Sequence, residues 1–330
     1  MKIQAVKHAV PDRRITNDGV VEAVRERNRQ NMDAEQLAAV ETQLRRHLAL
    51  AGTDVRYLSD GRDPIEYVRE AGEQALAAAE LGSRDIEFLI YAGIGRSWIE
   101  PAMANAVQHR LGLTGATCFD VLDACASWLR ALQIAHSFLR NGTYRRGMIV
   151  NCEVGLQRFA DLDFSQADDV EGKLATFTIG EAATATVVTA DAEDDDFYFT
   201  FKNFGQHSGL CVIPLDGGMR FVSHSAELIR TTVKEIVNVY RADENLSAAT
   251  YDICFGHTAS QKANEIIGRR LGLPAEIEFQ TRAKYGNTAA ASIPLAMSLA
   301  IEEGRLCRGH RTLCIMGSAG ITVGLAKFTF

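Results

Sequence analysis

The sequence predicts an α/β fold with two similar halves. Short apolar runs typical of buried strands alternate with stretches whose apolar residues recur at helical spacing. In the first half these runs lie at 88–91, 148–150 and 185–188, and in the second half at 253–255, 313–316 and 321–323. We therefore expect one half over residues 1–190 and another over 191–330. The acidic run 191–196 would join them as a solvated turn.

Composition and charge narrow the classes of function. A chain of 330 residues, 47% of them hydrophobic, can bury a large core. The first eight residues form no long apolar segment, and no stretch of about 18 uninterrupted apolar residues follows. We therefore expect a cytoplasmic protein that does not enter a membrane. The net charge of −7 disfavours a nucleic acid as partner, and we interpret the polar segment 25–46 as an exposed helix.

The seven cysteines do not have the spacing of a disulfide framework or a zinc site. They form an odd-numbered set without a paired C-x-x-C motif, at positions 118, 125, 152, 211, 254, 307 and 314. We therefore expect reduced thiols, no bound metal and no cofactor.

One cysteine lies where an enzyme could place a nucleophile. Cys125 follows the apolar run that starts at Phe119 and precedes a predicted helix. That helix has apolar residues at helical spacing and an Asn-Gly stop, namely Trp128, Leu132, Ala135, Leu139 and Asn141-Gly142. The macrodipole and the unpaired N–H groups at a helix N-terminus can lower the pKa of a thiol from about 8.5. We therefore expect a reactive thiolate at Cys125, the alternative being a buried structural cysteine.

A histidine and an asparagine lie at two further element junctions. The run Tyr251-Asp252-Ile253-Cys254-Phe255 predicts a buried strand, and a helix with an apolar face follows, so His257 occupies the corner between them. Asn287 follows Gly286 and can open the next helix as its N-cap. Each residue alone has an ordinary structural role. Together with Cys125 they offer a thiol, an imidazole and an amide at three junctions.

These segments resemble those of the 3-oxoacyl-acyl-carrier-protein synthase III family. Asp123-Ala124-Cys125-Ala126, a strand ending in Gly256-His257, and Tyr285-Gly286-Asn287-Thr288 occur in the order seen in these ketosynthases. The segments 178–185 and 317–324 are similar to the family's midpoint strand and terminal glycine stretch. The likeness covers nearly the whole chain. It implies a thiolase-like fold, with two duplicated halves in five αβαβα layers, and a homodimer.

The resemblance also implies a role for each site residue. Cys125 would hold the acyl group as a thioester, taken from coenzyme A or an acyl carrier protein. A malonyl-type thioester would then lose carbon dioxide, and the side chains of His257 and Asn287 would stabilise its enolate oxygen. The backbone N–H groups of Cys125 and Ala319 would form an oxyanion hole. The product would enter fatty acid or polyketide biosynthesis.

The chain departs from the family pattern at positions that affect the substrate. Thr258-Ala259-Ser260 stands where the primary-metabolism enzymes have Gln-Ala-Asn. Ala319 stands in the glycine stretch, and its backbone donor is kept if its φ is negative. No tryptophan lies between residues 11 and 57 to stack on the adenine of coenzyme A, which leaves loading from coenzyme A open.

Charged residues at two places have an open role. Lys262 takes the position of a docking arginine for the carrier protein, and Arg269 and Arg270 extend a basic patch, unless these residues form an ordinary solvated helix face. Glu100 stands where the family commonly has an apolar residue that reaches into the partner subunit's acyl pocket. Its carboxylate could suit a polar acyl group, act as a base whose pKa burial raises, or point to solvent.

Four functions therefore remain open. The intact Cys-His-Asn set favours a decarboxylating ketosynthase. A second possibility is condensation of two acyl thioesters without decarboxylation, with Glu100 as base. A third is acyl transfer from Cys125 to an alcohol, amine or carrier thiol, with His257 as base. The fourth is a non-catalytic partner subunit of a heterodimer.

Overall fold

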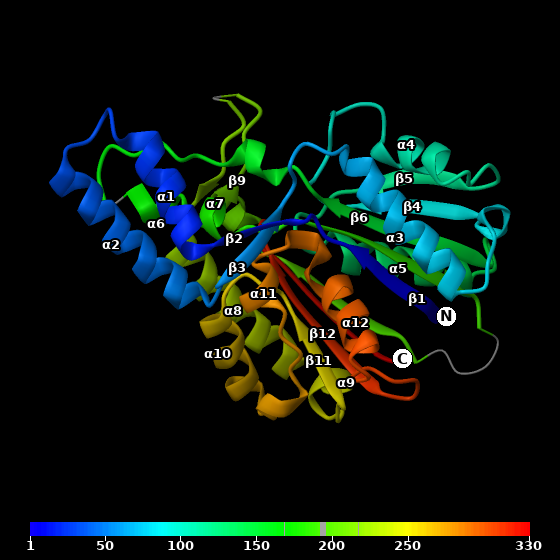
Figure 1. Cartoon of the computed structure of the whole chain (residues 1–330). Coiled ribbons are helices and arrows are strands. Elements are labelled where there is room, and N and C mark those ends of the chain that lie inside the picture. The colour runs from blue at the N-terminus through cyan, green and yellow to red at the C-terminus, as the bar shows by residue number, and fades with distance from the viewer. Residues whose placement is uncertain (168, 192–195, 217) are drawn as a thin grey trace.

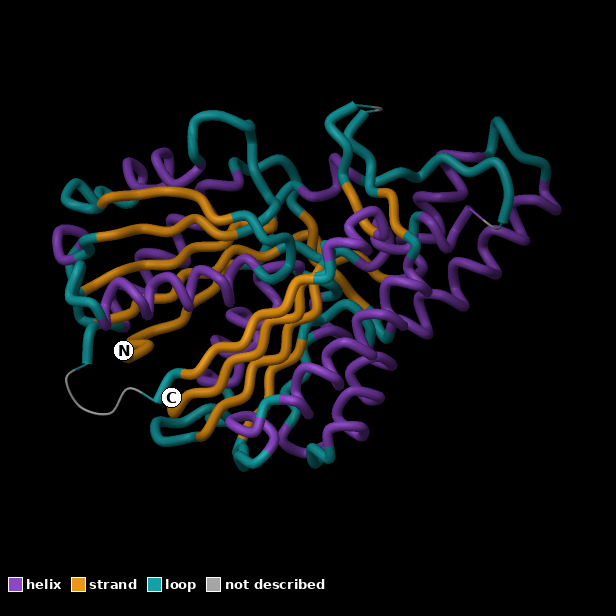
Figure 2. The backbone as a smooth tube through the Cα atoms, turned by 180° about the vertical axis from the view of Figure 1, so that it is seen from behind, coloured by secondary structure: helices purple, strands orange, loops and turns teal. Residues whose placement is uncertain are grey.

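Two β-sheets form the body of the molecule (Figure 1). The computed structural model describes residues 1–167, 169–191, 196–216 and 218–330. The first sheet has the order β1-β7-β6-β4-β5, with β1 (Lys2–Ala9), β4 (Phe88–Ala92), β5 (Thr117–Val121), β6 (Arg146–Glu153) and β7 (Ala182–Thr189). The second has the order β11-β12-β13-β8, with β8 (Tyr198–Asn203), β11 (Ile253–Gly256), β12 (Arg311–Ser318) and β13 (Thr322–Thr329). Figures 1 and 2 show the strands of both sheets running toward the middle of the molecule.

The two sheets share one topology. In the first, β7 pairs antiparallel with β1 and β6, and β4 runs parallel to β6. In the second, β13 pairs antiparallel with β8 and β12, and β11 runs parallel to β12. In the first sheet, β4 is also paired in parallel with β5. The matching neighbour of β11 is a single residue, Glu278, which forms a parallel bridge with Cys254. Part of the predicted join, 192–195, lies outside the described residues.

Helices form three layers around these sheets. The helices α5 (Ser127–Arg140) and α12 (Ser292–Glu302) share one hydrophobic core with strands of both sheets, so they form the central layer. The helices α3 (Pro64–Ala78) and α4 (Met103–Arg110) pack with the first sheet, whereas α8 (Ser225–Ala242) and α10 (Gln261–Leu271) pack with the second. The layers therefore follow the order αβαβα, which confirms the predicted fold.

Further elements lie outside the two main sheets and their helical layers. The helices α1 (Asn17–Asn28), α2 (Ala34–Ala51), α6 (Asp169–Gly172) and α7 (Leu174–Thr178) contribute to a separate small core. Two small sheets pair β2 (Arg13–Thr16) with β3 (Val55–Leu58) and β9 (Cys211–Val212) with β10 (Val222–Ser223). The remaining helices are α9 (Glu244–Ser247), α11 (Arg282–Tyr285) and the 3₁₀ segments Ser83–Asp85, Leu156–Phe159, Gly205–Leu210, Ala275–Ile277 and Ala289–Ala291.

The segment 25–46 forms parts of two helices rather than one. α1 ends at Asn28, and Asp33 starts α2 because its carboxylate accepts the N–H of Gln36 at 2.8 Å while the Gln36 side chain accepts the N–H of Asp33 at 3.0 Å. Several arginines of this segment form exposed ion pairs, for example Arg25 with Glu41 at 2.7 Å. These pairs support the prediction of a solvated helical surface.

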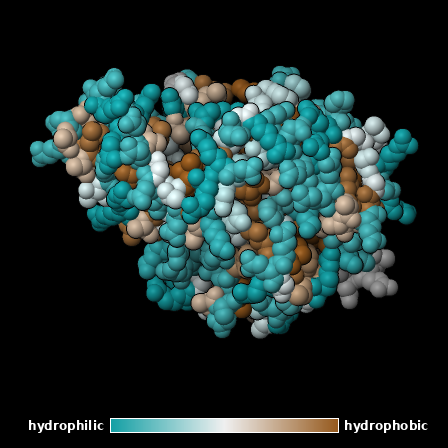
Figure 3. Space-filling view, in the orientation of Figure 1, coloured by the Kyte–Doolittle hydropathy of each residue, from teal (hydrophilic) through white to brown (hydrophobic). Residues whose placement is uncertain are grey.

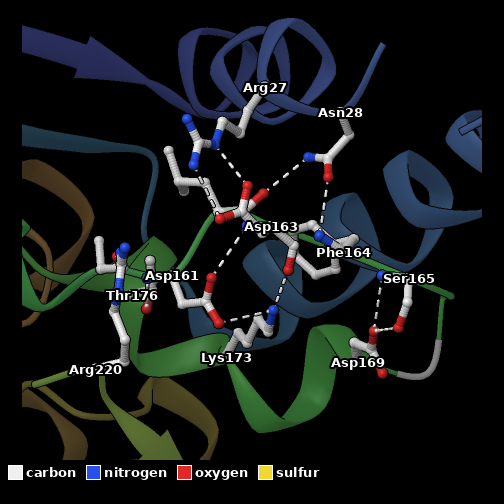
Figure 4. Close-up of polar contacts among 12 residues, drawn as sticks. Arg27, Asn28, Asp161, Asp163, Phe164, Ser165, Asp169, Lys173, Thr176 and Arg220 are labelled. Carbon is white, nitrogen blue, oxygen red and sulfur yellow. Dashed lines mark hydrogen bonds and ion pairs between the residues drawn. The ribbon is translucent and has the colours of Figure 1, made fainter. Parts of the chain in front are cut away.

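A polar cluster fixes α1 to the chain that leads into α7 (Figure 4). Arg27 binds Asp163 with Nε to Oδ1 at 2.5 Å, and Asn28 accepts the backbone N–H of Phe164 at 2.8 Å. Lys173, directly before α7, pairs with Asp161 at 2.9 Å. The cluster thereby holds in place the segment that continues to the wall of the central cavity.

The face of the molecule in Figure 3 is mostly hydrophilic, with small hydrophobic areas between polar side chains. Within the described ranges, no helix combines the length and the hydrophobicity needed to cross a bilayer. All seven cysteines are free, and three of them are buried.

Candidate active site

Four predicted site residues line one cavity in the middle of the molecule. Cys125 precedes α5, His257 follows β11, Asn287 follows α11, and Ala319 lies between β12 and β13. The cavity has about 1050 Å³ of empty space, part of it open to solvent. The structure therefore brings together the thiol, the imidazole and the amide that lie far apart in the sequence.

A strained turn presents the thiol of Cys125. The preceding residue, Ala124, has φ 44°, in the left-handed region where a side chain costs energy. Asp123 holds this turn because its carboxylate accepts the Thr322 hydroxyl at 2.9 Å and Nε of Arg130 at 3.1 Å. The second sheet and α5 together fix the position of this thiol.

The pKa of the Cys125 thiol is raised, so the expectation of a lowered value was wrong. Burial is the largest cause, and the carboxylate of Glu153 is the next. The backbone N–H of Cys125 itself lowers the pKa, but by less than burial raises it. The position before a helix therefore does not suffice to form a resting thiolate at this buried site.

His257 is a neutral imidazole in this environment. Burial lowers its pKa to about 3, with a further contribution from the Arg282 guanidinium. Its backbone is fixed on both sides, because its N–H donates to the Ile315 carbonyl at 3.1 Å and its carbonyl accepts the Asn264 amide at 3.1 Å. A neutral ring can donate one hydrogen bond, and the partner of Nδ1 decides which nitrogen donates.

Two hydroxyl groups lie behind the ring of His257. Nδ1 is 3.1 Å from Oγ of Ser292, and that oxygen is 2.8 Å from Oγ1 of Thr258. Thr258 accepts the N–H of Thr288 at 3.3 Å, so its own proton can go to Ser292. The Ser292 hydroxyl also lies 2.6 Å from the carbonyl of Ala289, which can accept its proton. The hydroxyl can therefore turn its proton either to this carbonyl or to Nδ1, and only the second orientation leaves the ring proton on Nε2.

Replacing Ser292 by alanine should remove the hydrogen-bond partner of Nδ1 and change the balance between the two tautomers of His257. One neutral hydrogen bond has a net value of about 1 kcal/mol, so we expect condensation to slow about threefold to tenfold while acylation of Cys125 changes less. The ¹⁵N chemical shifts of His257 would report this change in the tautomer balance. Unchanged shifts in Ser292→Ala would contradict a role for this hydroxyl in positioning the ring proton.

The side chain of Asn287 is oriented by its own loop. Its Oδ1 accepts the N–H of Ala289 at 3.0 Å, so its NH₂ group is the end left to donate. Its backbone is tied to Thr178 and Gly180 by bonds of 2.8 and 3.0 Å. Gly286 is required here, because a Cβ would lie 2.6 Å from the Thr178 carbonyl and the φ is 70°.

Asn287 does not cap the following α-helix as predicted. The bond to Ala289 starts a 3₁₀ turn, Ala289–Ala291, and α12 begins only at Ser292, with Ala291 as its N-cap. The extra turn reflects a second strained alanine, since Ala289 has φ 46°.

The depressed pKa of His257 predicts a specific pH dependence of stability. Below pH 6.5 the His257 imidazole becomes protonated in the unfolded chain, whereas in the folded chain it stays neutral down to about pH 3. The free energy of unfolding therefore falls by about 1.4 kcal/mol per pH unit in this range. Glu153 affects stability in the opposite direction, because burial raises its pKa from 4.5 to about 7. The stability that its protonated form contributes is therefore lost as the pH rises through that range.

Urea unfolding of the wild type and His257→Asn at pH 7 and pH 5 separates the two groups. Both chains contain Glu153, so the difference between them isolates His257. We expect the stability of the wild type relative to the variant to fall by about 2 kcal/mol between these values. A difference that stays constant would show that His257 protonates normally in the folded state.

The other predicted site residues lie at the surface or on the cavity rim. Lys262, Arg269 and Arg270 are exposed on α10, and Lys262 lies 3.5 Å from Glu265. Glu100 is exposed and does not line the cavity of this chain. Ala319 has a negative φ, which meets the condition for keeping its backbone donor.

Two residues near the reacting groups were not predicted. Ser292 was not singled out, because its contact with His257 joins residues that are far apart in the sequence. Glu153 is fully buried and accepts the N–H groups of Ile94 and Gly95 at 3.1 and 2.9 Å. Nothing in the apolar strand around Glu153 indicated a role beside the thiol.

No cluster of three or more histidine, cysteine or carboxylate side chains suited to a metal occurs in the part of the chain that is described.

Comparisons with known proteins point to one family. The model of 3-oxoacyl-[acyl-carrier-protein] synthase III matches residues 119–205, and the model of its C-terminal part matches residues 242–330, together more than half of the chain. The beta-ketoacyl-[acyl-carrier-protein] synthase III of Clostridium perfringens is 28% identical over 83% of this chain and 87% of its own. That of Rhizorhabdus wittichii is 28% identical over 92% and 95%.

Solved structures share the fold. The 3-oxoacyl-[acyl-carrier-protein] synthase III of Aquifex aeolicus superposes with a TM-score of 0.85 at 23% identity, over 100% of this chain and 99% of the other. OleA of Xanthomonas campestris, solved with bound lauric acid and lauroyl-CoA, gives 0.83 at 21% identity over 99% and 98%.

Proposed function

Because the chain belongs to the 3-oxoacyl-[acyl-carrier-protein] synthase III family of acyltransferases, we propose that it is a decarboxylating ketosynthase. The sulfur of Cys125 attacks a coenzyme A or carrier-protein thioester and takes its acyl group, and the donor leaves as a free thiol with the proton that Cys125 gives up. A malonyl-type thioester then loses carbon dioxide, and its enolate carbon attacks the acyl carbonyl. The thiolate of Cys125 leaves, and the product is a 3-oxoacyl thioester.

The observation that carries this proposal is the pair of neutral donors beside the thiol. His257 and the NH₂ group of Asn287 line the same cavity as Cys125, and Oδ1 of Asn287 is already occupied. Donors held in advance stabilise a developing enolate without reorganisation during the reaction. Water molecules around the enolate would instead have to reorient as its negative charge develops.

The low pKa of His257 favours this route over acyl transfer with His257 as base. A group whose conjugate acid has a pKa of about 3 is a weak proton acceptor near neutral pH. Condensation without decarboxylation would need Glu100 of a second copy as the base, because Glu100 does not line the cavity of its own chain. The complete set of Cys125, His257 and Asn287 also speaks against a non-catalytic partner subunit.

The oxyanion of the acyl thioester needs its own donors. We assign these to the backbone N–H groups of Cys125 and Ala319, since both residues line the cavity and Ala319 keeps a negative φ. The exposed residues Lys262, Arg269 and Arg270 on α10 would attract an acidic acyl carrier protein.

A homodimer would use the edge of the first sheet. Among the described strands, β5 pairs only with β4 and is therefore an edge strand. Leu122 directly follows it and is 61% exposed, and Ile99 is 69% exposed. A second copy at this edge would cover these apolar side chains and would decide whether Glu100 becomes buried.

Mass spectrometry of the intact protein tests the proposal. The wild type would be exposed to acyl thioesters and then to malonyl-carrier protein. We expect a covalent acyl adduct, followed by a product two carbons longer and release of carbon dioxide. Loading without decarboxylation would instead support either condensation of two acyl thioesters or acyl transfer to an alcohol, amine or carrier thiol. No loading from any donor would support the role of a non-catalytic partner subunit.

A further inference from the structure

The cavity that contains Cys125 continues beneath helix α10. Its apolar wall includes Val233 and Ile236 of α8, Ile267 of α10 and Ile315 of β12. These side chains belong to the core that the second sheet shares with α8 and α10, two helices that lie beside this sheet in Figure 1. The reacting thiol is therefore connected to space inside the outer helical layer of the same chain.

A second cavity lies farther along this path. It has about 860 Å³ of empty space, part of it open to solvent, and lies between α10, the second sheet and the segment 273–278. Three residues line both cavities, namely Asn264, Ile267 and Ile315. These three side chains therefore form the boundary between the two spaces, here called the constriction.

The polar end of Asn264 is bound at this constriction. Its NH₂ group donates to the His257 carbonyl at 3.1 Å, and its side chain is also hydrogen-bonded to the Glu278 carboxylate. Gly256 leaves the room for this arrangement, because a Cβ there would lie 2.9 Å from Nδ2 of Asn264. The other two side chains at the constriction, Ile267 and Ile315, are both apolar.

We propose that the two cavities form one acyl channel, and that the substrate is a linear acyl thioester long enough to pass between Ile267 and Ile315. This inference rests on the proposed function and names its substrate class. The acyl chain would start at Cys125 and end near Leu273 and Ile277 of the second cavity. Each methylene buried beyond the constriction should improve binding about fourfold, which is the fold-change of its transfer from water.

Narrowing the constriction gives the decisive test. In Ile267→Phe the larger ring should block the passage, whereas the matched variant Ile266→Phe changes the neighbouring residue of α10, which lines neither cavity. Mass spectrometry would measure the rate of Cys125 acylation from acetyl, octanoyl, lauroyl and palmitoyl thioesters. We expect Ile267→Phe to keep acetyl loading but to lose palmitoyl loading at least about tenfold, and Ile266→Phe to load all four as the wild type does.

A second variant keeps the test valid if Ile267→Phe does not fold. Ile277 lines only the second cavity, so Ile277→Phe should shorten the channel at its far end and slow palmitoyl loading more than octanoyl loading. Equal palmitoyl loading by the wild type and both variants would overturn the channel. A wild type that accepts acetyl but no longer chain would also overturn it, whereas loading by no thioester would contradict the proposed function itself.

Discussion

Cys125→Ser should lose acyl transfer by at least about a thousandfold, as expected when the nucleophile of a covalent mechanism is removed. A hydroxyl is a much weaker nucleophile than a thiol, and the cavity offers it no strong base, since the pKa of His257 is about 3. The measurement is the rate at which the intact protein gains the mass of the acyl group.

The chain contains a matched control for this substitution. Cys211 is a second thiol on the wall of the same cavity, so Cys211→Ser makes the same chemical change in the same environment. We expect it to load the acyl group at the rate of the wild type. If Cys211→Ser lost the acyl adduct and Cys125→Ser kept it, the nucleophile would be Cys211 and the assignment to Cys125 would be contradicted.

Asn287→Ala should slow condensation by about 10²–10³, the usual loss when one donor to a developing oxyanion is removed. Acylation of Cys125 should change by less than about tenfold, because the proposed oxyanion hole for that step consists of backbone N–H groups. Single-turnover measurements of loading and of 3-oxoacyl product separate the two steps.

An exposed asparagine gives the comparison for this variant. Asn238 lies on α8, points to solvent and does not line the cavity, so Asn238→Ala should leave both steps unchanged. Equal losses of loading and condensation in Asn287→Ala would contradict a role confined to the enolate. They would indicate that Asn287 maintains the structure of the whole cavity.

The elements of the core could be predicted from the sequence because their signals are local. The run at 313–316 lies in β12, and the helical pattern from Trp128 to Leu139 lies in α5. The division of 25–46 into α1 and α2 was missed, although Asp33 and Gln36 form a capping box there. Asp33 and Gln36 lie among many other polar residues, so the helix cap that they form does not stand out in this segment.

The candidate site was predicted as a set of residues but not as a chemical environment. Cys125, His257 and Asn287 could be named because each stands at an element junction within a motif that resembles those of a known family. The direction of the thiol pKa was wrong because the helix N-terminus is a local signal, whereas burial and the nearby Glu153 arise from the packed fold.

The fold class, the family and three candidate site residues can be predicted from the sequence alone, because periodicity and motif order are properties of neighbouring residues. The neutral state of His257, its contact with Ser292 and the two cavities that share Ile267 and Ile315 arise only from the tertiary structure. These properties depend on the distances and the solvent exclusion created when the two sheets and their helices pack together.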